Sequence, residues 1–155
     1  MDLIVEQATV KDAPDILDLQ RHAYLSEAAI YNEYGIPPLI QTLDEMLASF
    51  ETQFFLKVTS KDRIIGSVRA YAEAGTCFIG RLIVSPDAQN QGIGTRLMKE
   101  IEAVFGQARR FEVFTGHRSE RNLHLYQRLG YRPFRRERIT PSLTLVYLEK
   151  VIQDS

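Results

Sequence analysis

The pattern of apolar and polar residues predicts one strand and two helices in the first third of the chain. Residues 3–8 have the composition of a short strand, and Asp12 followed by Pro14 marks the start of a helix. Apolar residues at helical spacing carry this helix to about Tyr24. After a break that contains a glycine and two prolines, the spacing returns and predicts a second helix over residues 39–50.

The middle of the chain is predicted to form an antiparallel meander of three strands. Residues 52–59 and 64–73 have strand composition and are separated by the turn-like segment 60–63. A second turn at Ala74-Gly75 leads into the apolar run 76–84.

The second half of the chain alternates helices and strands. A helix follows a glycine-rich turn, and its apolar residues are Leu97, Met98, Ile101, Val104 and Phe105. The remaining elements are predicted as a strand at 111–115, a helix at 122–129 that Gly130 ends, and strands near 131–137 and 143–150. The order β-α-α-β-β-β-α-β-α-β-β predicts an α+β (mixed α/β) fold around one central sheet.

Composition is that of a globular domain. The 155 residues are 45% hydrophobic and 25% charged, so we expect one domain over 1–155 with a real core, and not a disordered or fibrous chain. No apolar run approaches the roughly 20 residues that cross a bilayer, and the amino terminus lacks a signal-peptide pattern, so we expect no membrane association. A single cysteine, Cys77, fits a cytoplasmic protein and predicts no metal site.

Charge is balanced in total but unevenly distributed. Residues 1–55 hold ten acidic and two basic residues, whereas residues 109–138 hold nine arginines and three acidic residues. This asymmetry favours an anionic ligand on the later segment and a cationic one near the earlier segment. The arginines could equally form a solvated surface, or bind nucleic acid with an affinity that falls steeply with salt. We expect no nucleic-acid partner.

The glycine-rich turn has the chemistry of a phosphate site. The first amides of a helix lack hydrogen-bond partners and carry the positive end of the helix dipole. Gly92 and Gly94 remove side chains at this point, and Thr95 adds a hydroxyl. The spacing matches neither the P-loop nor the Rossmann fingerprint. Taken alone, two glycines at a helix start can also be a packing device.

With its flanks, this segment resembles the acyl-CoA binding motif of the GNAT superfamily of N-acetyltransferases. Leu82-Ile83-Val84-Ser85-Pro86 is followed by Gln89-Asn90-Gln91-Gly92-Ile93-Gly94, and the second family motif is matched by Leu125-Tyr126-Gln127-Arg128-Leu129-Gly130-Tyr131. The resemblance implies a mostly antiparallel, splayed sheet of about seven strands with about four helices. It also implies transfer of an acetyl group from acetyl-CoA to a primary amine. The alternative is a non-catalytic acyl-CoA sensor of the same fold.

The resemblance further implies roles for individual residues. The backbone of Leu82, Ile83 and Val84 would pair with the pantetheine arm. The pyrophosphate would lie on the amides of Gln89, Asn90, Gln91, Gly92, Ile93, Gly94 and Thr95. A bulge in the strand at 76–84 and a splayed neighbour would open the slot, and a backbone N–H of that strand would stabilise the thioester oxygen. Tyr126 would act as the acid toward the CoA thiolate, although its spacing from Leu129 also suits a core aromatic. Arg128 would meet a remaining CoA phosphate, and Asn122 would replace the asparagine that relatives carry where this chain has Ser119.

The resemblance leaves several candidates for the proton acceptor. A protonated amine must lose a proton before it attacks, so a base is required. Many relatives place a glutamate where this chain has Gly80. Glu112 and His117 are the candidates that remain, with a water relay or another group as alternatives.

The acceptor pocket is expected to involve residues that vary across the family. Tyr24, Tyr31, Glu33 and Tyr34 are candidates on the early segment, whose acidity suits a cationic amine. With a two-residue turn at Ala74-Gly75, Arg69 lies opposite Gly80 and could instead hold a carboxylate or phosphate of the acceptor. The expected partner is a small-molecule or peptide amine, and a homodimer is possible.

Overall fold

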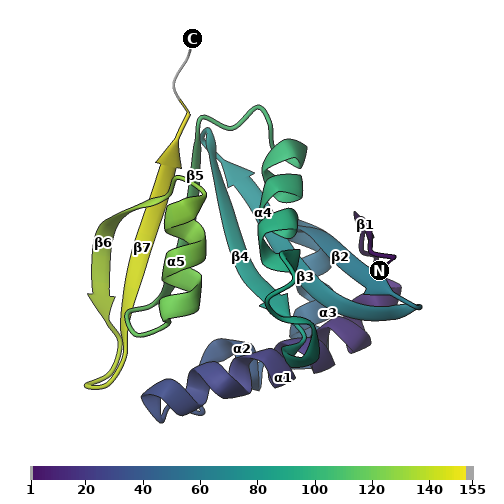
Figure 1. Ribbon diagram of the computed structural model, residues 1–155, viewed down its shortest axis with the longest axis horizontal. Coiled ribbons are helices and arrows are strands. Elements are labelled where there is room, and N and C mark those ends of the chain that lie inside the picture. The colour runs from purple at the N-terminus through teal and green to yellow at the C-terminus, as the bar shows by residue number, and fades with distance from the viewer. Residues whose placement is uncertain (1, 153–155) are drawn as a thin grey trace.

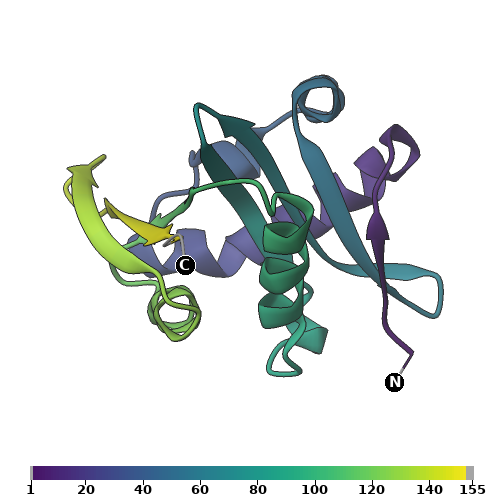
Figure 2. The ribbon, with the colours of Figure 1, turned by 90° about the horizontal axis from the view of Figure 1, so that it is seen from above.

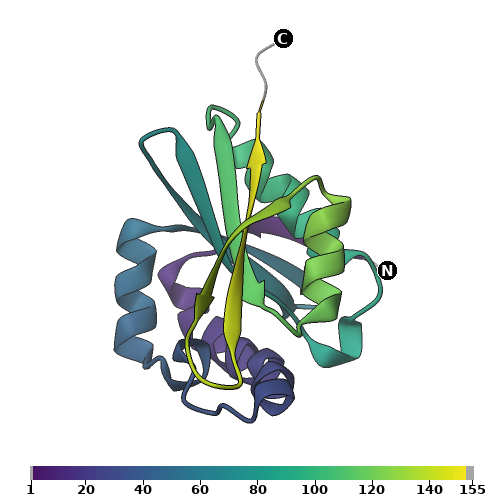
Figure 3. The same ribbon diagram turned by 90° about the vertical axis from the view of Figure 1, so that its left-hand side faces the viewer.

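The computed structural model describes residues 2–152 and has one sheet of seven strands, confirming the predicted α+β class. The strands are β1 (Ile4–Gln7), β2 (Phe54–Ser60), β3 (Arg63–Glu73), β4 (Thr76–Val84), β5 (Arg110–Gly116), β6 (Arg132–Arg138) and β7 (Thr144–Val151). They are ordered β1-β2-β3-β4-β5-β7-β6, and every neighbouring pair is antiparallel except β4 and β5. The β6–β7 hairpin forms one edge of the sheet (Figure 3).

The helices cover the sheet on both faces (Figures 1 and 2). They are α1 (Ala13–Tyr31), α2 (Pro37–Ile40), α3 (Leu43–Thr52), α4 (Ile93–Val104) and α5 (Glu120–Arg128), with short 3-10 turns η1 (Val10–Asp12) and η2 (Pro86–Ala88). The main core joins α4 and α5 to the sheet, and a second cluster joins α1 and α3 to the other face through Phe55. None of the helices within residues 2–152 combines the length and apolar composition that a membrane crossing requires.

Two helix boundaries differ from the sequence prediction. The first helix continues past Tyr24 to Tyr31 and ends at Asn32, which adopts the left-handed conformation that terminates helices. The helix predicted over 39–50 is divided, because Thr42 and Glu45 form a reciprocal capping box that starts α3 at Leu43. The extra turn of helix before it, α2, makes five helices where about four were predicted.

A bulge in β4 changes the direction of its side chains. Ser67 of β3 pairs with Ile83, but Arg69 pairs with Gly80, so β4 has one extra residue between these pairs. Arg81 occupies the bulge with a positive φ of 48°. The structure therefore confirms both the bulge and the predicted pairing of Arg69 with Gly80.

The parallel pair β4–β5 opens along its length (Figure 1). Thr76 to Phe78 pair with Arg110 to Glu112, and no pairing continues beyond these residues although both strands do. The side of β4 that faces β5 consequently has free backbone donors and acceptors from Ile79 onward. The predicted splay of the sheet is confirmed at this point.

Candidate active site

A groove of about 540 Å³ lies where the two halves of the sheet separate. It is bounded by α1, the end of β4, the loop into α4, and the start of α5. Its lining residues from the predicted set are Tyr24, Leu82, Ile83, Val84, Gln89, Asn90, Gly92, Ile93, Gly94, Thr95, Asn122 and Arg128. The structure thus brings together residues that are up to about a hundred positions apart, whereas the side chain of Gln91 is not part of the lining.

The amino end of α4 presents free amides to this groove. Gly92 is the N-cap residue with a positive φ of 77°, and the first helical hydrogen bond runs from the Arg96 N–H to the Gly92 carbonyl at 3.0 Å. The amides of Ile93, Gly94 and Thr95 therefore have no helical acceptor. Together with the helix dipole they form a site of positive potential suited to a phosphate oxygen.

The missing side chain at Gly94 allows α4 to pack closely against its neighbours. A Cβ at Gly94 would lie 3.3 Å from Leu125 Cδ2 and 3.8 Å from Leu82 Cδ2. The helix therefore lies close to both β4 and α5, and this close approach sets the width of the groove. At Gly92, a Cβ would meet nothing within 4 Å, so the requirement there is the left-handed backbone.

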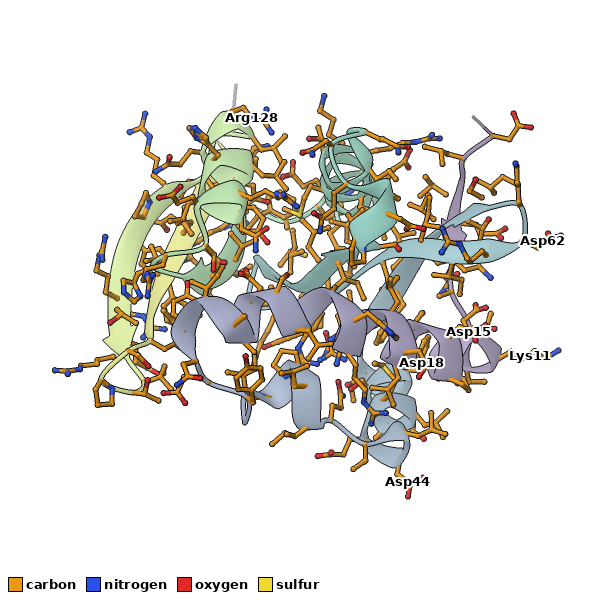
Figure 4. All side chains as sticks on the ribbon, turned by 60° about the horizontal axis from the view of Figure 1, so that its bottom comes forward. Lys11, Asp15, Asp18, Asp44, Asp62 and Arg128 are labelled. Carbon is orange, nitrogen blue, oxygen red and sulfur yellow. The ribbon has the colours of Figure 1, made fainter. Side chains whose placement is uncertain are left out.

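Two arginines of α5 extend the positive potential along the groove. Arg121 contacts the Gln89 side chain in the phosphate loop, and Arg128 lies two turns further along the same helix. Figure 4 shows Arg128 at the end of α5 away from α1. Arg121, which the sequence prediction did not name, thus contacts the loop directly.

Tyr126 is buried between α5 and the open strands. It is 5% exposed, and its ring lies 5.9 Å from that of Tyr131. Burial, with additional effects of Tyr24 and Glu27, raises the pKa of the Tyr126 hydroxyl. Tyr126 itself is not part of the groove lining, but its neighbour in sequence, Leu125, is.

Glu27 is a groove residue that the sequence prediction missed. Its Oε1 accepts a hydrogen bond of 3.2 Å from Asn122 Nδ2, and Asn122 also contacts Thr115 Oγ1 at 3.3 Å. Burial raises the pKa of Glu27, and the Ser119 hydroxyl and Arg121 partly oppose this shift. Glu27 lies three residues after Tyr24, on the same helix face. The sequence prediction missed Glu27 because it ended the first helix at about Tyr24.

The two predicted bases lie outside the groove. Glu112 sits where β4 and β5 still pair, and its Oε1 forms an ion pair of 2.9 Å with Arg110 Nη2. The same guanidinium binds Glu149 at 2.7 Å. His117 accepts the Thr144 N–H at Nδ1, at 3.1 Å, and packs against the ring of Tyr31. Neither side chain lines the groove.

Of the four acceptor residues predicted on the early segment, one lines the groove and three do not. Tyr24 lines the groove, but Tyr31 is buried and shares a hydrogen bond of 2.7 Å with Ser119 while accepting the Arg118 N–H at 2.9 Å. Glu33 accepts a hydrogen bond from Ser142 at 3.0 Å, and Tyr34 is 55% exposed. Tyr31 thus fastens α1 to the β5–α5 turn instead of facing a ligand.

Known proteins share both the sequence pattern and this fold. Residues 14–131 match the model of the acetyltransferase (GNAT) family. The chain belongs to the GNAT acetyltransferase family. A curated relative, UPF0157 protein YqkA of Bacillus subtilis (strain 168), is 29% identical over 126 residues, which make up 81% of this chain and 36% of YqkA. This GNAT chain therefore spans about a third of the length of that relative.

Solved GNAT structures have the same architecture. The PaiA N-acetyltransferase from Thermoplasma acidophilum in complex with coenzyme A has a TM-score of 0.82 at 18% identity, covering 97% of this chain and 99% of that one. The ribosomal-protein-S18-alanine N-acetyltransferase from Escherichia coli has a TM-score of 0.82 at 13% identity, covering 99% and 96%. The protein yncA from Salmonella typhimurium, with acetyl-CoA, reaches 0.78 at 18% identity, covering 100% and 96%. At such identities these likenesses show a shared fold.

The groove of this family member fits the shape and charge of an acyl-CoA. Free amides at the α4 mouth suit a diphosphate, and the unpaired edge of β4 offers hydrogen bonds to an extended arm with amide groups. Arg121 and Arg128 supply positive charge alongside. The geometry can therefore hold the nucleotide part of the ligand outside and direct its acyl end between the strands.

Proposed function

We propose that this protein transfers an acetyl group from acetyl-CoA to a primary amine by direct attack on the thioester. The observation that carries the proposal is the arrangement of free α4 amides at the mouth of a slot between β4 and β5. That arrangement places an anion-binding helix end beside β4, whose edge toward β5 pairs with no strand of residues 2–152 beyond Phe78. A thioester held there would lie close to Tyr24 and Glu27, which line the groove. Tyr126 is their neighbour, since in addition to the effect of burial both groups raise its pKa.

In the proposed reaction, Glu27 accepts a proton from the amine, and Tyr126 donates a hydrogen bond to the leaving sulfur. The amine nitrogen attacks the thioester carbonyl carbon, the C–S bond breaks, and the electron pair leaves on sulfur. Glu27 takes the proton that the amine must lose, since it is the carboxylate in the groove with a raised pKa. A free backbone N–H of β4 stabilises the carbonyl oxygen as it becomes negative.

Tyr126 acts on the departing sulfur. Its raised pKa keeps the hydroxyl protonated at neutral pH, so a hydrogen-bond donor is always present. A thiol is ordinarily more acidic than a phenol, so Tyr126 stabilises the thiolate by donating a hydrogen bond and does not lose its proton outright. The thiolate then picks up a proton from solvent.

Replacing Tyr126 with Phe tests this assignment. We expect turnover, measured as release of free CoA thiol with a panel of amines, to fall about 10²-fold, because one donor to a developing charge is lost. The dissociation constant for acetyl-CoA, measured by calorimetry, should change by less than about threefold, since the donor acts in the transition state. Tyr71→Phe, which alters an exposed tyrosine on β3, is the matched control and should leave both values unchanged.

Two results would contradict the proposal. Full activity of Tyr126→Phe would remove the tyrosine from the mechanism. Binding of acetyl-CoA without thiol release for any amine would instead favour the non-catalytic acyl-CoA sensor, which the absence of a carboxylate at Gly80 supports.

A further inference from the structure

Arg69 is a buried cation that forms no ion pair with any residue from 2 to 152. Its side chain is on β3, only 6% of the residue is exposed, and its Nη1 atom is buried with no hydrogen-bond acceptor among residues 2–152. The guanidinium lies over the Phe55 ring, 5.5 Å from its centroid. A buried guanidinium normally has a carboxylate or carbonyl partner, because its desolvation is otherwise costly.

A second guanidinium, that of Arg81, lies close enough to act on Arg69. Arg81 occupies the β4 bulge, and its Nη1 donates to Gln41 Oε1 at 2.6 Å. Gln41 is in turn held by the side-chain amide of Gln20 on α1 at 2.9 Å. Burial, reinforced by the neighbouring charge of Arg81, lowers the pKa of Arg69 to about 10. Within residues 2–152, neither arginine forms an ion pair with a carboxylate.

Open space adjoins this pair of cations. Gly80 lies directly opposite Arg69 in the β3–β4 register, so a side chain there would point to the same face of the sheet. A Cβ at Gly80 would meet no heavy atom within 4 Å. The position where the family resemblance leads one to expect a carboxylate is thus empty, next to a cation that lacks an anion.

Tyr24 connects this space to the acyl-CoA groove. Its side chain lines the groove, and its hydroxyl is close enough to Arg81 and Arg69 for both to lower its pKa against the larger effect of burial. Gly80 also lies in the part of β4 beyond Phe78, where the pairing with β5 has ended. An anion beside Gly80 would therefore be near the acyl end of a bound thioester.

We propose that Arg69 and Arg81 bind an oxyanion of the acceptor, so that the substrate is an amine that also carries a carboxylate or a phosphate. This inference rests on the proposed acetyltransferase function and specifies its substrate class. The substrate's anion takes the role that a protein carboxylate would otherwise fill, and the two planar guanidinium groups match its oxygens. The site then binds the anion and presents the amine toward the thioester.

The test compares amines that differ only in the anion. The common amino acids are each paired with their carboxamides, and O-phosphoethanolamine is paired with ethanolamine. We expect kcat/KM for thiol release to be higher for the anionic member of the correct pair by about 10²-fold, since a site built for hydrogen bonds rejects a substrate that leaves them unmade. A difference between the amino acids and their carboxamides would identify the anion as a carboxylate. A difference between O-phosphoethanolamine and ethanolamine would identify it as a phosphate.

Variants of Arg69 test whether this residue causes the preference for the anionic substrate. Arg69→Met removes the charge and leaves an unbranched apolar side chain in its place, so the preference for the anion should fall to less than about threefold. Arg69→Lys should retain part of it, and Arg63→Met, which alters an exposed arginine paired with Asp87, should retain all of it. The thermal midpoint of ligand-free Arg69→Met should equal or exceed that of the wild type, because an unpaired buried cation is replaced by an apolar side chain.

A binding experiment separates this inference from the proposed function. At constant ionic strength, N-acetylated amino acids or N-acetyl-O-phosphoethanolamine should raise the thermal midpoint of the wild type, whereas their neutral counterparts should not, and Arg69→Met should abolish the shift. If acetyl-CoA binds and amines are acetylated but anionic and neutral members behave alike in both assays, the inference is wrong and the function stands. Failure of the wild type to bind acetyl-CoA would reject the function itself.

Discussion

At the scale of single residues, the chemistry depends on which carboxylate reaches the groove. Glu112 is held by Arg110 at the paired end of the strands, whereas Glu27 is held by Asn122 inside the groove. The environment of Glu27 raises its pKa mainly through burial, which brings its basicity closer to that of an effective proton acceptor at neutral pH. The hydrogen bond from Asn122 also aims the carboxylate across the groove.

Glu27→Gln is predicted to lower kcat by about 10²-fold, the usual contribution of a positioned base. Only ionised Glu27 accepts a proton, so the wild-type rate should rise as pH increases through its pKa, above the ordinary value of 4.5. Glutamine does not titrate, and this rise should be absent from the kcat–pH profile of the variant. Glu51→Gln, on the exposed face of α3, is the control. A variant that keeps the rise would place the titrating group elsewhere.

At the scale of elements, the entrance to α4 combines two different uses of glycine. Gly92 permits the left-handed turn that points successive amides into the groove, and Gly94 allows α4, β4 and α5 to approach one another. The phosphate site is therefore a property of backbone conformation, and side chains there contribute little. Arg121 and Arg128 of the neighbouring helix add the charge.

Gly92→Ala is predicted to weaken acetyl-CoA binding by about 10-fold or more. The added Cβ has no neighbour within 4 Å, so the effect is conformational: alanine disfavours the positive φ by about 1 kcal/mol and turns the amides away. Calorimetry measures the affinity, and thermal unfolding should show a loss of about 1 kcal/mol in stability. Gly35→Ala, whose Cβ would also meet nothing within 4 Å, is the control. Wild-type affinity in Gly92→Ala would exclude the loop as the phosphate site.

At the scale of the molecule, the sheet consists of two parts with a narrow junction. The β1–β4 part and the β5–β7 part share only the short paired segment of β4 and β5, and α1 adds side-chain bridges through Tyr31 and Glu27. A ligand in the slot would bond to both parts. The predictions that concern partners, including the homodimer and the absence of a nucleic-acid partner, are not decided by this arrangement and stay predictions.

Acetyl-CoA is predicted to stabilise the junction. At a concentration of about 100 times its dissociation constant, binding contributes about 2.7 kcal/mol, which corresponds to a rise in thermal midpoint of several degrees. Hydrogen exchange followed by mass spectrometry should show added protection in residues 79–84 and at the start of α4, because their amides gain partners. The β2–β3 hairpin, which lies away from the slot and is paired from Phe54 to Ser60 apart from one bulge, should be unchanged. Protection spread evenly over the sheet would contradict binding in the slot.

Local residue patterns were enough to predict the backbone features of this protein. Strand positions, the glycine turn at Gly92 and the Leu125–Tyr131 motif depend on local residue patterns, so the fold class, the family and most of the groove lining followed from them. Even the Arg69–Gly80 pairing could be predicted, because a two-residue turn fixes the register of a hairpin.

Contacts between side chains of distant segments could not be predicted in this way. Glu27 and Asn122 are 95 positions apart, and their contact requires α1 to continue beyond Tyr24 and to cross the end of β5. Likewise, Glu112 is kept away from the groove by its place in the paired end of β4 and β5, and the burial of Arg69 depends on the elements packed around it. Local patterns encode backbone conformation, whereas the partner of a charged side chain is fixed only when distant segments come together.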